Sequence, residues 1–493
     1  MSTVIRQRSN LLTLGILLAM VPAGLVLVKV PFLSAGVLFG ALLLAAVLTH
    51  PLVVVGVMLF IGPIDLSFLT GGFKGLFEAA GGLDMNGIRL LGMSGGLAIT
   101  AVLLPNARRV LFGRWGIAYL IFLVWAGLTL IISPNLVDGL RLLTKLAYPL
   151  LIFVIVAGVA TERRHVDRLL DYTLAGAALV VVLSLFYTMA GRYGVYDTGL
   201  IRVRGVTLHE NPFSFYLLIA LYMSFARFAV RAQWRYLVLA GLLGIWMVLT
   251  LTRITFLAGA VGMAGIAIYS AVAARNTRAL FGAAAIALLV AVPLAPIVLQ
   301  RSLGYVPSPA ELIDLARSPM GLYEAINWQG REVVWPVVFA AFTAAPWTGL
   351  GLGASTAVMR EYFPPQVGEV VHNEYLRLAT DTGLVGVSLY AIAILLWCVA
   401  VIRADRVSCG AAREFTLPAL AGIVSWSILA LTDNLFDYYA PYTQFIGLLV
   451  GASVVAAAAA VRDADAQSAA RVGNASGDAG GGGIGARRMV AHE

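Results

Sequence analysis

The chain has 493 residues, of which 60% are hydrophobic and only 12% are charged. Soluble domains carry about 25% charged residues, so this composition excludes a soluble globular protein and predicts an all-α polytopic membrane protein. The net charge of +9 comes mostly from short loops between apolar runs, which excludes nucleic acid as the partner. Two cysteines, Cys398 and Cys409, are too few for a disulfide scaffold or a metal cluster.

Apolar runs long enough to span a bilayer, which takes about 17 to 25 residues, recur along most of the chain. They predict about 12 to 14 transmembrane helices, of which three are short. The runs are 10–28, 33–49, 51–64, 88–104, 116–133, 147–160, 172–190, 212–228, 236–252, 254–273, 280–299, 382–402, 416–431 and 441–461.

Arginines in the short breaks set the orientation, because positively charged short loops stay in the cytoplasm. Those on the expected cytoplasmic side are Arg6, Arg8, Arg108, Arg109, Arg114, Arg163, Arg164, Arg168, Arg227, Arg231, Arg235, Arg275, Arg278, Arg403, Arg406 and Arg413. Both termini are therefore expected in the cytoplasm. The expected parts are the first part of the transmembrane bundle (1–299), one large outward-facing helical loop (300–372), the last part of the bundle (373–461) and a disordered Ala/Gly/Ser-rich tail (462–493).

A second group of arginines falls on the outer side: Arg192, Arg202, Arg204, Arg253, Arg301, Arg317, Arg331, Arg360 and Arg377. The guanidinium fork matches phosphate oxygens, and several converging arginines can hold a diphosphate without a metal. Ion pairs with neighbouring carboxylates would explain any single arginine equally well. Arg253 differs from the rest because residues 236–273 carry only this charge and must form two helices joined by a tight turn at 252–255. Snorkelling to lipid headgroups is the alternative for Arg253.

The large loop contains signals for two short amphipathic helices. Ser308-Pro309-Ala310-Glu311 has the spacing of a capping box with proline at the first helical position. A second helix is expected to begin near Gly330 and to end before Pro346, with an apolar face that packs. The glycines from 349 to 353 lack a P-loop lysine and a preceding strand, so they predict a turn that approaches another segment closely rather than a nucleotide site.

His372 ends the large loop and precedes a predicted helix, 373–382, which Gly383 closes. A helix N-terminus favours neutral imidazole, the form that acts as a base, and it also favours a nearby anion. A structural histidine remains the alternative. Glu374 is the competing base, and Asn373 is equally explained as a helix cap.

Taken in order, these motifs resemble those of the O-antigen ligase and polysaccharide polymerase superfamily. The resemblance covers roughly residues 200–390. It is carried by Arg202-Val203-Arg204-Gly205, His209-Glu210-Asn211-Pro212, Leu251-Thr252-Arg253, Gly330-Arg331 with Trp335, Gly349 to Gly353, His372-Asn373-Glu374-Tyr375-Leu376, and Gly383-Leu384-Val385-Gly386. Thr252 departs from the serine that is frequent in the family and keeps its hydroxyl group.

The resemblance implies an inverting, metal-independent glycosyltransferase, without a cofactor, on the periplasmic face of the bacterial inner membrane. Its donor would be a glycan on undecaprenyl diphosphate. It implies that His372 deprotonates the acceptor hydroxyl and that Arg253 and Arg331 act with it. Arg202, or Arg204 in its place, would hold the diphosphate. Asn373 and Glu374 complete the expected diphosphate- and glycan-binding set.

Two reactions fit this resemblance. A polymerase joins repeat units of exopolysaccharide or O-antigen on the carrier lipid, and chain length with helix number favours it slightly. A ligase moves the finished glycan to lipid A core or protein. A flippase for lipid-linked oligosaccharides is the alternative from another class, although the charges cluster at helix ends rather than near mid-membrane. Membrane lipids and other polysaccharide-assembly proteins are further expected partners.

Overall fold

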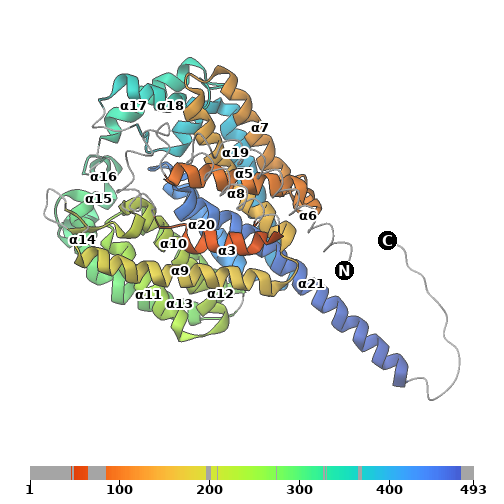
Figure 1. The fold of residues 1–493 in the computed structure, drawn as a ribbon. Coiled ribbons are helices and arrows are strands. Elements are labelled where there is room, and N and C mark those ends of the chain that lie inside the picture. The colour runs from red at the N-terminus through yellow and green to blue at the C-terminus, as the bar shows by residue number, and fades with distance from the viewer. Residues whose placement is uncertain are drawn as a thin grey trace.

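The computed structural model describes residues 46, 49–64, 85–191, 193–195, 201–207, 209–273, 275–325, 328, 330–364 and 369–478. The helix expected at 10–28 and nearly all of that at 33–49 lie outside these ranges. The structure confirms an all-α membrane protein (Figure 1). Strands β1 (Tyr193–Val195) and β2 (Ile201–Val203) form a small antiparallel pair in which Gly194 lies opposite Arg202.

Six helical segments within the described ranges are long and apolar enough to cross a membrane. They are α8 (Leu136–Val159), α9 (Arg163–Met189), α10 (Glu210–Arg231), α12 (Arg253–Ala273), α19 (Glu374–Val407) and the span Leu435–Ala469, which joins η6 (Leu435–Tyr438), η7 (Tyr439–Thr443) and most of α21 (Gln444–Asp478). Helices α13 (Arg278–Ile286) and α14 (Val292–Leu303) meet at a 70° bend around the π-helix η4 (Ala287–Ala291), and together they have the length and apolar composition of a seventh, broken span. The total of 12 to 14 stays a prediction.

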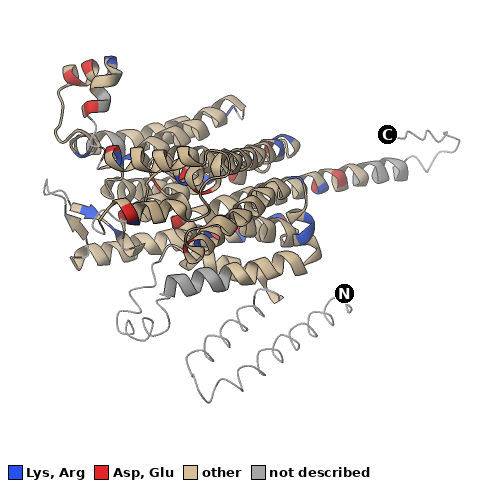
Figure 2. Ribbon diagram, turned by 90° about the horizontal axis from the view of Figure 1, so that it is seen from above, with Lys and Arg blue, Asp and Glu red and all other residues tan. Residues whose placement is uncertain are grey.

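The shorter elements complete the bundle and its loops. They are α3 (Pro51–Ile61), α5 (Met85–Leu103), α6 (Pro105–Leu111), α7 (Ile117–Thr129), η2 (Leu130–Ile132), η3 (Gly205–Thr207), α11 (Trp234–Leu249), α15 (Pro309–Arg317), α16 (Pro319–Ala325), α17 (Arg331–Ala344), α18 (Ala354–Tyr362) and α20 (Arg413–Leu429). Figure 2 shows that most of the helical ribbon carries neither acidic nor basic residues, as a lipid-facing bundle requires.

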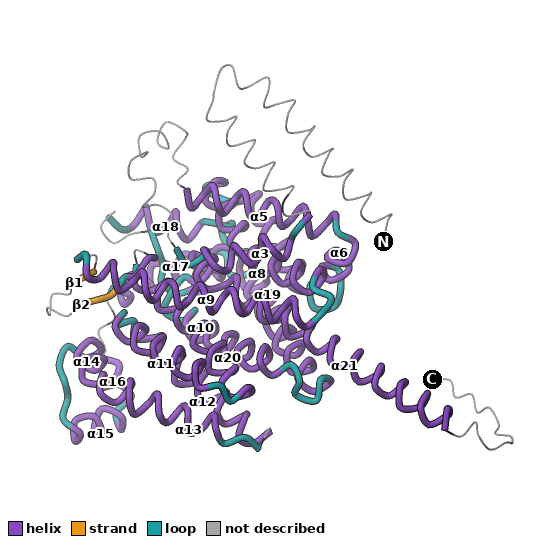
Figure 3. The backbone as a smooth tube through the Cα atoms, turned by 60° about the horizontal axis from the view of Figure 1, so that its bottom comes forward, coloured by secondary structure: helices purple, strands orange, loops and turns teal. Residues whose placement is uncertain are grey.

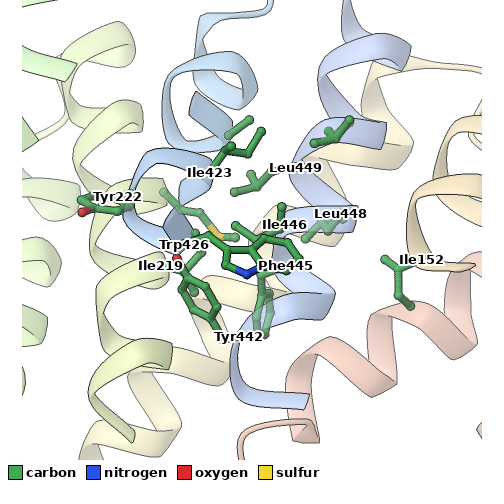
Figure 4. Close-up of a cluster of buried hydrophobic side chains, with 14 of the residues drawn as sticks. Ile152, Ile219, Tyr222, Ile423, Trp426, Tyr442, Phe445, Ile446, Leu448 and Leu449 are labelled. Atoms are coloured by element: carbon green, nitrogen blue, oxygen red, sulfur yellow. The ribbon is translucent and has the colours of Figure 1, made fainter. Parts of the chain in front are cut away.

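Helix α10 is largely buried inside the bundle and packs against α11 and α20. Figure 4 shows side chains of α10, α20 and α21 in one buried cluster. Between helices in lipid, close packing and hydrogen bonds replace the hydrophobic effect as the source of association. Gly422 of α20 allows this approach, because a Cβ there would lie 2.8 Å from Ile219 and from Ile446. The Tyr222 hydroxyl donates to the carbonyl of Ala258 at 2.6 Å, which ties α10 to α12.

Two helices extend further than their apolar runs. The run at 147–160 is the second half of α8, which begins at Leu136 behind the N-cap Asn135. Lys145 interrupts the apolar pattern, so the sequence did not predict the first half of α8 as part of the span. In the fold, Lys145 pairs with Asp437 at 2.6 Å, which neutralises its charge. At the other end, α21 continues to Asp478, so the tail expected to be disordered from residue 462 is helical to that point. Figure 3 shows this part projecting from the bundle, and its alanines favour helix without tertiary packing.

The large loop forms helices α15 to α18. The capping box at α15 is confirmed, because Glu311 N donates to Ser308 Oγ at 3.3 Å and Ser308 N donates to Glu311 Oε2 at 2.7 Å. Helix α17 begins at Arg331 as expected. The glycine turn before α18 lies close to the bundle: Gly351 has φ +102° and an added Cβ would lie 2.6 Å from the backbone of Ser133. The predicted close approach is therefore confirmed.

Candidate functional site

A cavity of about 610 Å³ opens at the end of the bundle where α10 and α12 begin. The cavity is lined by β2, the start of α10, the α11–α12 turn, the end of α14, the start of α17, the residue before the N-cap of α19, and the loop after α20. Four of the predicted site residues lie on it: Arg202, Arg253, Arg331 and His372. The fold thus brings together residues that are far apart in the sequence.

His372 pairs with a buried carboxylate in this cavity. Its Nδ1 lies 3.3 Å from Asp433 Oδ1, and the side chains of His372 and Asp433 are 37% and 1% exposed. A carboxylate only accepts hydrogen bonds, so Nδ1 carries the proton and Nε2 keeps its lone pair. Asp433 therefore fixes His372 in the tautomer that can accept a proton at Nε2.

The charge of Asp433 is stabilised by its surroundings. Burial alone would raise the pKa of Asp433, but the hydrogen bond with His372, the charge that His372 carries when protonated, the backbone N–H of Asn434 and the guanidinium of Arg331 hold this pKa below its ordinary value. Asn211 Nδ2 also donates to Asp433 Oδ2 at 2.6 Å. Asp433 is therefore an ionised carboxylate at neutral pH.

The backbone around His372 is held on both sides. His372 itself has φ +54°, an uncommon conformation for a residue other than glycine. Asn373 caps α19, since its Oδ1 accepts from Leu376 N at 3.0 Å, and its own backbone N–H donates to Asn434 Oδ1 at 3.1 Å. The helix predicted after His372 is confirmed, and it breaks at Gly383, where φ is +68°. His372 is therefore the residue before the N-cap, anchored to the loop that carries Asp433.

Asn373 and Glu374, which were predicted to bind the ligand, are not among the residues that line the cavity. Asn373 is a helix cap. Glu374 is fully buried, and its Oε2 accepts from Phe436 N at 3.2 Å while its Oε1 lies 3.6 Å from Arg377 Nη1. Arg377 in turn pairs with Asp437 at 3.0 Å. Glu374 thus belongs to an internal ion-pair network.

Arginines make the cavity cationic. Arg202 donates to Thr250 O at 2.8 Å and to Asn211 Oδ1 at 3.1 Å, and it also pairs with Glu210. Arg331 donates to Thr432 O at 3.0 Å. Burial lowers the pKa of Arg331 and the nearby Asp433 carboxylate opposes this, so the guanidinium stays charged at neutral pH.

Arg301, named from the sequence only as one of the outer-side arginines, also lines the cavity. Arg253 lies within 3.5 Å of the carbonyl of Ser302, the residue after Arg301. The four lining arginines exceed the two lining carboxylates, those of Glu210 and Asp433, which leaves a formal excess of positive charge. This balance favours an anionic ligand.

Arg204 does not line the cavity. Its side chain is 48% exposed and lies 3.4 Å from Glu210. Of the two arginines, Arg202 is therefore the one that lies on the cavity wall. Asp433 was not predicted from the sequence as a site residue. The one local signal for it is a charged residue two positions after the apolar run 416–431.

The fold and this cavity define a polytopic membrane protein whose cationic cavity holds a histidine–aspartate pair. Residues 237–391 match the family model described as O-Antigen ligase, and this match supports a relationship of the chain to the O-antigen ligase-related superfamily. The matched segment contains Arg253, Arg301, Arg331 and His372, whereas Arg202 and Asp433 lie outside it. None of the curated proteins compared with the chain matches it.

Proposed function

We propose that the chain transfers a glycan from undecaprenyl diphosphate to an acceptor hydroxyl group. The observation that carries this proposal is the pair of His372 and Asp433 inside a cavity lined by four arginines. A base and a diphosphate-binding surface are the two elements that such a transfer requires. The superfamily supports the same reaction class.

In the proposed reaction, Nε2 of His372 removes the proton of the acceptor hydroxyl as its oxygen attacks the anomeric carbon. Asp433 stabilises the imidazolium that forms. The bond from the anomeric carbon to the diphosphate oxygen breaks on the opposite face, so the configuration at that carbon inverts. The leaving diphosphate gains negative charge, and fixed guanidinium groups stabilise this charge more in the transition state than in the substrate. Arginines would thus supply the positive charge without a metal ion or cofactor.

The cavity is proposed to face the periplasm, with both termini in the cytoplasm. Asn211 lies at the cavity end of α10, and Arg231 lies twenty residues further along the helix, where it pairs with Glu414 and Asp167. At 1.5 Å per residue these positions are about 30 Å apart, the thickness of the hydrocarbon core. Arg163 and Arg227, which were also expected on the cytoplasmic side, lie near the same two carboxylates, and this supports a cytoplasmic location for that end.

The test is glycan transfer by purified protein in lipid nanodiscs. His372→Ala should abolish transfer, whereas His165→Ala, a matched change on α9 at the opposite end of the bundle, should retain it. Inversion should appear by NMR as a changed anomeric configuration in the product. Full transfer by a folded His372→Ala protein would rule out the base and favour the flippase alternative.

The identity of the acceptor distinguishes two reactions, polymerisation of repeat units and ligation of a finished glycan. We propose polymerisation of exopolysaccharide or O-antigen repeat units, with both substrates on the carrier lipid. The description of the matching family favours the alternative, ligation to lipid A core or protein. Chain growth with lipid-linked repeat units as the only glycan substrate would support the polymerase. Transfer that begins only after lipid A core or protein is added would support the ligase.

A further inference from the structure

A second histidine, His209, lines the same cavity at the N-terminus of α10. It is the N-cap residue of this helix, and its Nδ1 accepts a hydrogen bond from the backbone N–H of Asn211 at 3.2 Å. A ring nitrogen that accepts a hydrogen bond carries no proton, so in neutral His209 the proton is on Nε2. The side chain is exposed on the cavity side, where Nε2–H can reach a ligand.

The two histidines therefore have opposite tautomers. His372 has its proton on Nδ1, beside Asp433, and its Nε2 can accept a proton. His209 has its proton on Nε2 and can only donate there. Asn211 connects them, because its backbone N–H fixes His209 and its side-chain Nδ2 donates to Asp433. In this geometry, Nε2 of neutral His372 can accept a proton, and Nε2–H of neutral His209 can donate a hydrogen bond.

The surroundings of His209 keep it neutral. Removal of water by the surrounding protein lowers the pKa of His209. The carboxylates of Glu210 and Asp433 oppose this change, and the guanidiniums of Arg202 and Arg204 add to it. A neutral N–H donor stabilises an anionic oxygen without adding a further positive charge to a cavity that already has four arginines.

We infer that His209 donates a hydrogen bond from Nε2 to a non-bridging oxygen of the carrier-lipid diphosphate. This inference rests on the proposed function. A phosphate oxygen is the expected partner because the groups that share the cavity wall are guanidiniums, whose fork geometry matches phosphate. His209 is thereby a substrate-binding residue and does not act as a second base.

Two substitutions separate the donor role from the capping role. His209→Asn keeps an oxygen that can cap α10, since asparagine is among the best N-cap residues, but its side chain is too short to replace Nε2–H. His209→Gln places an amide N–H near the position of Nε2 and loses the favourable cap. The measurement is the dissociation constant of farnesyl diphosphate, an isoprenoid diphosphate without a glycan, with purified full-length protein. Thermal unfolding of each variant serves as the check on folding.

The donor role predicts that His209→Asn binds farnesyl diphosphate roughly tenfold more weakly, as expected for the loss of one hydrogen bond to a charged group, and that His209→Gln recovers most of the affinity. A role limited to capping predicts the reverse order, which would overturn the inference. Equal affinities of wild type and His209→Asn would also overturn it while leaving the proposed transfer intact. A wild-type protein that binds the diphosphate but transfers no glycan would contradict the proposed function, and the order of the two variants would still decide the inference.

Discussion

Asp433→Asn is the substitution that tests the proposed base most directly. Asparagine has nearly the same shape as aspartate but no charge, so the loop after α20 keeps its packing. The change removes the carboxylate that lies 3.3 Å from His372 Nδ1 and accepts from Asn211 Nδ2 at 2.6 Å. Glycan transfer should fall because the imidazolium formed during the reaction loses its counter-charge.

The size of this effect follows from the geometry. Two unit charges 3.3 Å apart, the separation of His372 Nδ1 and Asp433 Oδ1, interact by about 5 kcal/mol at an effective dielectric constant of about 20. The His372 side chain is 37% exposed, so solvent screening reduces this energy to about 2 to 3 kcal/mol. The rate of transfer should therefore fall about 30- to 150-fold.

Initial rates of transfer in nanodiscs measure this effect, with the donor and acceptor at saturating concentration. Asp314→Asn, the same chemical change at an exposed position on α15, is the matched control and should leave the rate unchanged. If folded Asp433→Asn transfers glycan within about threefold of the wild-type rate, the carboxylate is not the partner of the base and the reasoning is refuted.

Three further predictions follow from the same contacts. Arg202→Lys should reduce glycan transfer about tenfold or more, because lysine cannot reproduce the guanidinium fork. Arg204→Lys should have little effect on transfer, and equal losses in the two variants would contradict the choice of Arg202. Gly351→Ala should lower the free energy of unfolding by about 2 kcal/mol or more, and Gly241→Ala, where a Cβ meets nothing within 4 Å, should not, as denaturation in detergent would show. Because the pKa of Asp433 is lowered in the fold, ionised Asp433 stabilises the folded state. This stabilisation is fully present above pH 3.8, the ordinary pKa of aspartate, and it is lost as the pH falls through the lower folded-state pKa. The Asp433→Asn protein should not lose this stability at acid pH. If the free energy of unfolding of wild type and Asp433→Asn changes in the same way with pH, the prediction is contradicted.

Local patterns in the sequence predicted the features that depend on neighbouring residues. The apolar runs located most helices because lipid requires every backbone group to be paired within a helix. A turn between two helices followed from a length that one helix cannot occupy, although it lies between Leu249 and Arg253 rather than at 252–255. The capping box at Ser308 depends on residues three apart. The helix after His372 and its break at Gly383 were predicted for the same reason.

Contacts between distant residues account for what the sequence could not show. Glu374 is a carboxylate close to His372 in the sequence, which made it a candidate site residue. In the fold it is buried, and its carboxylate accepts a hydrogen bond from the backbone of Phe436, 62 residues later. Lys145 interrupts the apolar pattern of α8 but is neutralised by Asp437, 292 residues away. Arg301 and Arg204 cannot be told apart by spacing, and only the fold brings Arg301 to the cavity.

The chemistry of the cavity depends on residues on both sides of the matched family segment. Residues 237–391 include His372 and three of the lining arginines, which provide a basic group and positive charge. The groups that decide the protonation of the histidines lie outside it: Asn211 precedes the segment and Asp433 follows it. Without Asp433, His372 would have no carboxylate to select the tautomer with a basic Nε2. The proposed functional unit is therefore the matched segment together with the start of α10 and the loop after α20, because their combination sets the tautomers that we propose for a base at His372 and a donor at His209.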